Sequence, residues 1–194
     1  KIAPAIEKVT SGAATVGNAV QSTVDRAASA LNGASGGSRQ QQFVARLSGA
    51  AEQVAREVGI PASYMLGQAG HETGWGRSQI KQADGSNSFN VFGIKAGKGW
   101  TGKVAEVTTT EYINGQAQKV KAKFRAYDSY QDAFRDYARL ISDSPRYAKV
   151  MDSLHSAQSF AAGLQRAGYA TDPQYASKLS RTINTALNLQ RAQA

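Results

Sequence analysis

Residues 104–127 read VAEVTTTEYINGQAQKVKAKFRAY, and this stretch decides the fold class of the chain. Two strand-like segments, 104–113 and 116–127, are separated by Asn114-Gly115, a dipeptide that favours the two-residue turn of a β-hairpin. The patterns on both sides of the hairpin are helical. The sequence therefore predicts an α+β fold, mostly α, with one hairpin between groups of helices.

The helices are predicted from apolar residues that recur every three or four positions. Residues 76–100 lack this period and are expected to form a loop. Ser129 and Asp132 have the spacing of a capping box and mark one helix start. The expected helices run from Phe43 to Gly59, from Pro61 to near Gly74, from Ser129 through Ile141, from 157 to 166, and from Asp172-Pro173 through Leu187.

The composition excludes several classes of protein. The 194 residues suffice for one packed domain with a short appendage, and no stretch approaches the ~18–20 apolar residues of a membrane-spanning helix. No basic-then-apolar leader is present, so a cleavable signal peptide is not expected in this sequence. Cysteine is absent, and the two histidines, His71 and His155, form no HExxH pair. Disulfides, a cysteine nucleophile and a metal site are therefore not expected.

Residues 1–38 and 39–194 differ in composition and are predicted to be separate units. The first segment has no aromatic residue, a weak helical pattern and a Gly/Ser-rich end, which predicts a tether or a docked amphipathic helix with a linker. The second segment is the expected folded domain and carries nearly all of the formal net charge of +9. This charge favours a polyanionic partner, and the lack of nucleic-acid-binding signatures makes nucleic acid less favoured than anionic lipid or acidic cell-wall polymer.

Glu72 is the first candidate catalytic residue. It lies near the end of an apolar helix, where Gln68 shares its face at a spacing of four residues. A partly desolvated carboxyl group there should have a raised pKa, as the general acid of a glycosidase requires. An ordinary surface glutamate is the alternative, but a negative charge at a helix C-terminus opposes the helix dipole, which favours a functional role.

The register of the hairpin separates two further carboxylates. With Asn114-Gly115 as the turn, Glu106 faces Lys123 on a cationic face and is expected to form an ion pair with it. Glu111 faces Gln118 on the less polar face and is the better catalytic candidate, although an exposed polar residue near the hairpin tip remains the alternative. Two carboxylates on separate elements suit glycoside hydrolysis, and Trp75, Trp100, Phe89 and Tyr169 could supply flat surfaces for sugar rings.

Several motifs follow one another in order along residues 61–185. They are Gly67-Gln68-Ala69-Gly70-His71-Glu72-Thr73-Gly74-Trp75-Gly76, Asn90-Val91-Phe92-Gly93-Ile94-Lys95, Thr108-Thr109-Thr110-Glu111-Tyr112, Lys119-Val120-Lys121-Ala122-Lys123-Phe124-Arg125 and Gly168-Tyr169-Ala170-Thr171-Asp172-Pro173-Gln174-Tyr175-Ala176. Together these motifs resemble the peptidoglycan-hydrolase domain of flagellar rod assembly proteins, which belongs to the glucosaminidases of glycoside hydrolase family 73. His71 is a departure, because the family often has a small or apolar residue before the glutamate.

The resemblance implies a lysozyme-like helical lobe and a small β-hairpin lobe over a glycan-binding cleft. It assigns the general acid to Glu72 and the second carboxylate to Glu111, the residue that the hairpin register also favours. No metal or cofactor is implied. The substrate-binding or supporting residues that it implies are Trp75, Asn90, Phe92, Tyr169 and Asp136.

The expected activity is endo-acting hydrolysis of the peptidoglycan glycan strand at the β-1,4 bond after N-acetylglucosamine. A flagellar role would place the protein in the periplasm or at the cell wall, with peptidoglycan and flagellar rod proteins as partners. The alternatives are a stand-alone autolysin or phage-type lysin, a muramidase or lytic transglycosylase on the same fold, and a binding module that holds glycan without cutting it.

Overall fold

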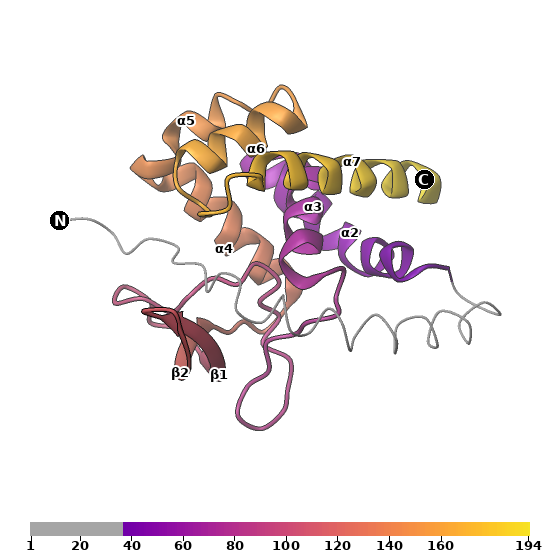
Figure 1. Cartoon of the computed structure of the whole chain (residues 1–194). Helices are drawn as coiled ribbons and strands as arrows, with labels where there is room; N and C mark the ends of the chain where they lie inside the picture. Colours follow the sequence, from indigo (N-terminus) through magenta and orange to yellow (C-terminus); the bar gives the residue numbers. More distant parts are fainter. Residues whose placement is uncertain (1–36) are drawn as a thin grey trace.

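The computed structural model describes residues 37–194, and all but the last two residues of the predicted tether or helix of residues 1–38 lie outside this range. Within the described residues, a group of helices forms one lobe and a two-stranded hairpin lies at its side (Figure 1). The elements are α2 (Arg39–Val58), α3 (Ala62–Thr73), β1 (Val104–Ile113), β2 (Gln116–Arg125), α4 (Tyr130–Asp143), the 3₁₀ turn η1 (Pro145–Tyr147), α5 (Ala148–Met151), α6 (Ala157–Arg166) and α7 (Tyr175–Gln193). The predicted α+β, mostly α fold is confirmed.

Helix α3 lies between α2 and α7 and is the central element of the helical lobe (Figure 1). It begins after Pro61, as predicted, and ends at Gly74, whose φ of 58° continues the chain in the left-handed conformation that glycine tolerates. Gly67 lets α7 approach closely, because a Cβ there would lie 2.6 Å from the Ile183 Cα. The backbone of α3 is therefore fixed by its neighbours on both sides.

The other predicted helices are present. Helix α2 ends at Gly59, the side chain of Ser129 caps α4 by accepting a hydrogen bond from the Asp132 N–H, and α6 covers residues 157–166 as expected. The final helix starts at Tyr175, slightly later than the predicted Asp172-Pro173. The short helical segment of η1 and α5 had no counterpart in the sequence prediction. Among the described helices, none combines the length and apolar character needed to cross a bilayer.

The hairpin has the predicted register. Ile113 pairs with Gln116 around the turn, Glu111 pairs with Gln118, and Glu106 pairs with Lys123. The predicted less polar face is the one that packs inward, since its residues Ala105, Ala122 and Phe124 are buried. The hairpin joins the rest of the molecule through residues 90–96, where Lys95 and Phe124 form an isolated bridge.

Candidate active site

Glu72 occupies the last turn of α3 and is half-buried. Its Oε1 lies 3.5 Å from the amide nitrogen of Gln68, which is on the same helix face as predicted. Its Oε2 faces Gly93 in the loop before the hairpin. A Cβ added to Gly93 would lie 3.9 Å from this oxygen. The carboxyl group therefore lies between the helical lobe and the loop that leads to the hairpin.

The end of α3 is closed by hydrogen bonds that fix the direction of the following chain. The Thr73 hydroxyl donates to the Ala69 carbonyl at 2.8 Å and accepts from the Gly76 N–H at 2.9 Å. These bonds tie the turn to the helix immediately after Glu72. The position of the Glu72 backbone thus depends on the packed interior of the lobe.

Three buried tyrosines surround Glu72 from the side of the lobe. Burial raises the pKa of Tyr137, Tyr169 and Tyr175 well above the ordinary value, and the charge of Glu72 raises it further. The hydroxyls of Tyr137 and Tyr169, like that of nearby Tyr147, are buried and have no hydrogen-bond partner within the described residues. All of these phenols stay neutral across the range in which a carboxylic acid titrates.

Trp75 packs against the helix rather than standing free. Its φ is 60°, and its ring lies so close to Gly70 that a Cβ there would be 2.8 Å from it. The edge of the ring contacts Phe43 of α2, with ring centroids 5.7 Å apart. The side chain is half-buried, so it closes the side of the lobe beside Glu72 and leaves part of its ring accessible.

Asn90 and Phe92, both predicted to bind substrate, are buried. The Asn90 amide donates to the carbonyls of Ile94 and Arg125 at 2.9 and 2.8 Å, and its side-chain oxygen accepts from the N–H of Phe92 and of Ile94. Phe92 stacks on Tyr137 with ring centroids 4.1 Å apart. In the structure these two residues shape the loop that faces Glu72, and direct sugar contact by either stays a prediction.

Tyr169 also differs from the expectation of an accessible substrate contact. Only 1% of its surface is exposed, and its ring stacks on Tyr175 at 5.8 Å. Tyr169 lies in the interior, close enough to Glu72 for the charge of that residue to raise its pKa. Its contact with substrate stays a prediction.

The hairpin carries the second predicted carboxylate. By the alternation of β1, position 111 belongs to the same face as Ala105, while the side chain of Glu111 lies outside what the structure describes. The prediction that Glu106 forms an ion pair with Lys123 is wrong. Glu106 instead pairs diagonally with Lys121 at 3.3 Å, because diagonal neighbours on one face lie within reach of a long lysine side chain.

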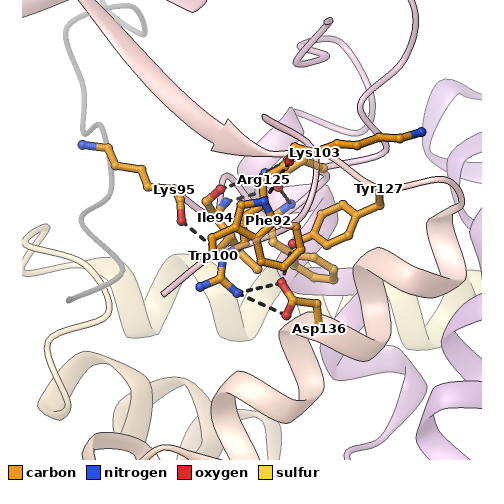
Figure 2. A network of polar contacts seen from close by, with 9 residues as sticks. Phe92, Ile94, Lys95, Trp100, Lys103, Arg125, Tyr127 and Asp136 are labelled. Carbon is orange, nitrogen blue, oxygen red and sulfur yellow. Dashed lines mark hydrogen bonds and ion pairs between the residues drawn. The ribbon is translucent and has the colours of Figure 1, made fainter. Parts of the chain in front are cut away.

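Asp136 belongs to a network at the base of the hairpin (Figure 2). Its carboxylate accepts from Nη1 of Arg125 at 3.0 and 3.1 Å and from the Tyr127 hydroxyl at 2.6 Å. The Arg125 guanidinium lies under the Trp100 ring, 4.7 Å from its centroid, and the indole N–H donates to the Lys103 carbonyl. Burial and the Asp136 charge raise the pKa of Tyr127, so this hydroxyl remains a donor. The network joins the end of β2 to α4.

The comparisons with known proteins agree with this arrangement. The family model described as "Glucosaminidase: Mannosyl-glycoprotein endo-beta-N-acetylglucosaminidase" matches residues 48–188. The chain belongs to this glucosaminidase family. The match includes α3, the hairpin and the tyrosine-bearing segments, and therefore every candidate residue named above.

Individual members of the glucosaminidase family are similar in sequence and in structure. "Peptidoglycan hydrolase FlgJ" of Salmonella typhimurium is 47% identical over 168 residues, which are 87% of this chain and 51% of that protein. A crystal structure of a peptidoglycan hydrolase mutant from Sphingomonas sp. A1 is 49% identical, with a TM-score of 0.69 over 78% of this chain and 99% of that one. The truncated glycoside hydrolase domain of Salmonella typhimurium FlgJ gives 48% identity and a TM-score of 0.67 over 77% and 98%. The chain spans about half the length of the curated relatives it matches.

Proposed function

We propose that this glucosaminidase domain hydrolyses the glycan strand of peptidoglycan at the β-1,4 bond after N-acetylglucosamine. The observation that carries the proposal is the position of Glu72, half-buried at the end of α3 and turned toward Gly93. A carboxyl group in that setting suits a general acid, which protonates the bridging sugar oxygen as the glycosidic bond breaks. The relatives named peptidoglycan hydrolase support peptidoglycan as the substrate.

Glu111 is the proposed second carboxylate. It would activate water as a base or stabilise the positive charge that develops on the sugar ring. The 2-acetamido group of the substrate is an alternative internal nucleophile, in which case Glu111 would orient that group. The backbone register supports the assignment, since it places position 111 on the inward face of the hairpin.

The deciding experiment compares wild type with Glu72→Gln on purified peptidoglycan, with the products identified by mass spectrometry. We expect wild type to release fragments with N-acetylglucosamine at the reducing end. Loss of a positioned general acid should lower the rate about 10²–10⁴-fold. Glu52→Gln is the matched control, because Glu52 is an exposed residue of α2 and its substitution should leave the rate unchanged.

The products also separate the competing activities. Fragments that end in N-acetylmuramic acid would indicate a muramidase, and anhydro-muramic products would indicate a lytic transglycosylase. Equal and negligible activity of wild type and Glu72→Gln, with retained glycan binding, would indicate a binding module. Each of these results would contradict the proposed cleavage after N-acetylglucosamine.

The proposed setting is the periplasm or the cell wall, where the domain would open the wall for the flagellar rod. This part of the proposal rests on the name FlgJ of the Salmonella relative and on the net charge of +9, which suits an anionic wall polymer. A pull-down of flagellar rod proteins with and without residues 1–38 tests the flagellar role. Wall cleavage without any rod-protein binding would favour a stand-alone autolysin or lysin.

A further inference from the structure

Gln68 has a buried amide that connects two important groups. Its side chain is fully buried on α3, one turn before Glu72. The amide nitrogen lies 3.5 Å from the Glu72 Oε1 and also donates a hydrogen bond to the hydroxyl of Tyr175 on α7. The two hydrogens of one amide group are thus directed at the candidate acid and at a tyrosine from a distant part of the chain.

This geometry makes the two oxygens of Glu72 different. An oxygen that accepts a hydrogen bond from an amide uses a lone pair, so Oε1 is the oxygen that stays unprotonated in the neutral acid. The proton then belongs on Oε2, which is the oxygen that faces Gly93 and the loop before the hairpin. The position of the amide therefore decides which oxygen can deliver a proton to a ligand on that side.

The buried tyrosines near Glu72 do not supply this asymmetry. Tyr137 of α4, Tyr169 and Tyr175 of α7 are buried, and their raised pKa values keep them neutral. Gly93, on the side of the loop, brings no ionisable group. Gln68 contributes a donor that contacts the carboxyl group of Glu72 directly.

We infer that Gln68 is a positioning residue for the general acid, and that Tyr175 holds Gln68 in place. The pair keeps the acidic proton of Glu72 on the oxygen that faces the substrate side. The inference rests on the proposed glycoside hydrolysis and adds two residues that act through Glu72. Both are fully buried, so neither can touch a glycan directly.

The first test is Tyr175→Phe, which removes only the hydroxyl. We expect kcat on soluble glycan strands of alternating N-acetylglucosamine and N-acetylmuramic acid to fall about tenfold, since small misplacements of a catalytic group are costly. KM should stay unchanged. Tyr147→Phe is the matched control, because it removes another buried hydroxyl that has no hydrogen-bond partner in the described part of the chain, and we expect wild-type kcat.

The second test is Gln68→Glu, which keeps the size of the side chain but replaces the amide with a carboxyl group. Two adjacent carboxyl groups oppose each other's ionisation, so the alkaline limb of the rate profile should move up by about one pH unit or more. Loss of the amide donor should also lower the maximal rate. A merely structural role would lower activity without moving the limb. Thermal unfolding of each variant confirms that the compared proteins are folded.

The outcomes separate this inference from the proposed function. Inactive wild type, or equal activity of wild type and Glu72→Gln, would overturn the proposed function itself. The positioning role alone would be overturned if wild type is active and Glu72→Gln is inactive, but the other variants show no effect. In that case Tyr175→Phe would behave like Tyr147→Phe, and the alkaline limb of Gln68→Glu would not move. The expected pattern is a slow Tyr175→Phe, a normal Tyr147→Phe and a shifted limb in Gln68→Glu.

Discussion

The two candidate carboxylates belong to regions of very different construction. Glu72 is on a helix packed between α2 and α7. Its surroundings include Tyr137 of α4, Tyr169 of the segment before α7 and Tyr175 at the start of α7. Glu111 is on a hairpin in which the residues described as buried, Ala105, Ala122 and Phe124, are all near its base. The end toward the turn is solvent-exposed over residues 113–119.

This difference fits the two proposed roles, with the general acid held rigidly on α3 and the second carboxylate carried by a hairpin that can move. A two-stranded hairpin with few buried contacts is marginally stable by itself and opens more easily than a packed core. Substitutions that disturb the packing of α3 against its neighbours should therefore lower stability and activity together. Substitutions at the hairpin should lower activity with a smaller effect on unfolding of the whole domain.

Alkaline pH should lower the stability of the helical lobe, and this is the largest effect that we expect. The folded-state pKa values of Tyr137, Tyr169 and Tyr175 are raised, so only the unfolded state loses these protons just above pH 10, and stability falls as pH rises there. Each phenol should remove about 1.4 kcal/mol per pH unit, or about 4 kcal/mol for the three at pH 11. Thermal unfolding measured from pH 8 upward, with tyrosinate absorbance followed in parallel, checks this. Phenols that ionise well before unfolding would contradict it.

Gly67→Ala should destabilise the helical lobe nearly as strongly. The new Cβ would lie 2.6 Å from the Ile183 Cα and 2.8 Å from its backbone nitrogen, and backbone atoms cannot move aside without separating α3 from α7. Overpacking of this kind costs about 3 kcal/mol, and activity should be lost with stability. Denaturant unfolding measures the effect.

Gly49→Ala is the control for that experiment. Gly49 is an exposed residue of α2, and a Cβ there meets no atom within 4 Å. Because alanine favours a helix over glycine, this variant should be more stable by about 0.5–1 kcal/mol. Equal effects at Gly67 and Gly49 would show that the α3–α7 contact is not close.

Asp136→Asn should act at the base of the hairpin. It removes the charge that faces Arg125 and leaves the Tyr127 hydroxyl with a weaker acceptor (Figure 2). Charged hydrogen bonds of this kind contribute about 1.5–3 kcal/mol. Hydrogen exchange should speed up in β1 and β2 while the amides of α3 stay protected, and activity should fall. Uniformly faster exchange in both regions would argue against a hairpin that moves independently.

Local patterns in the sequence predicted the parts of the site that lie on single elements. Asn114-Gly115 determined the turn and hence the register that pairs Glu111 with Gln118. The glycine after Thr73 marked the end of α3, which placed Glu72 in its last turn with Gln68 on the same face. In these cases one short segment contains both the signal and the structure.

The parts that the sequence did not predict are formed by residues from distant segments. Tyr137, Tyr169 and Tyr175 come together because α4, the segment before α7 and the start of α7 meet in the buried core, and no spacing in the sequence records that packing. Asn90 and Phe92 looked like accessible loop residues, yet the loop folds inward and hydrogen-bonds with its own backbone. The predicted partner of Glu106 is wrong because the reach of the lysine side chain, as well as the strand register, determines which residues form an ion pair.

Charge removal on the outer face of the hairpin should give the smallest effect on stability and a selective effect on binding. Lys119 and Lys123 are exposed on β2, so the variant Lys119→Gln/Lys123→Gln should change the free energy of unfolding by less than about 0.5 kcal/mol. Binding to peptidoglycan at low salt should weaken about twofold to threefold, and the difference should vanish at high salt because exposed charges are screened. Lys149→Gln/Arg181→Gln removes the same charge from the exposed surface of the helical lobe. Equal loss of binding in both variants would mean that only the net charge attracts the domain to peptidoglycan. A larger loss in the hairpin variant would show that the hairpin also contacts the polymer.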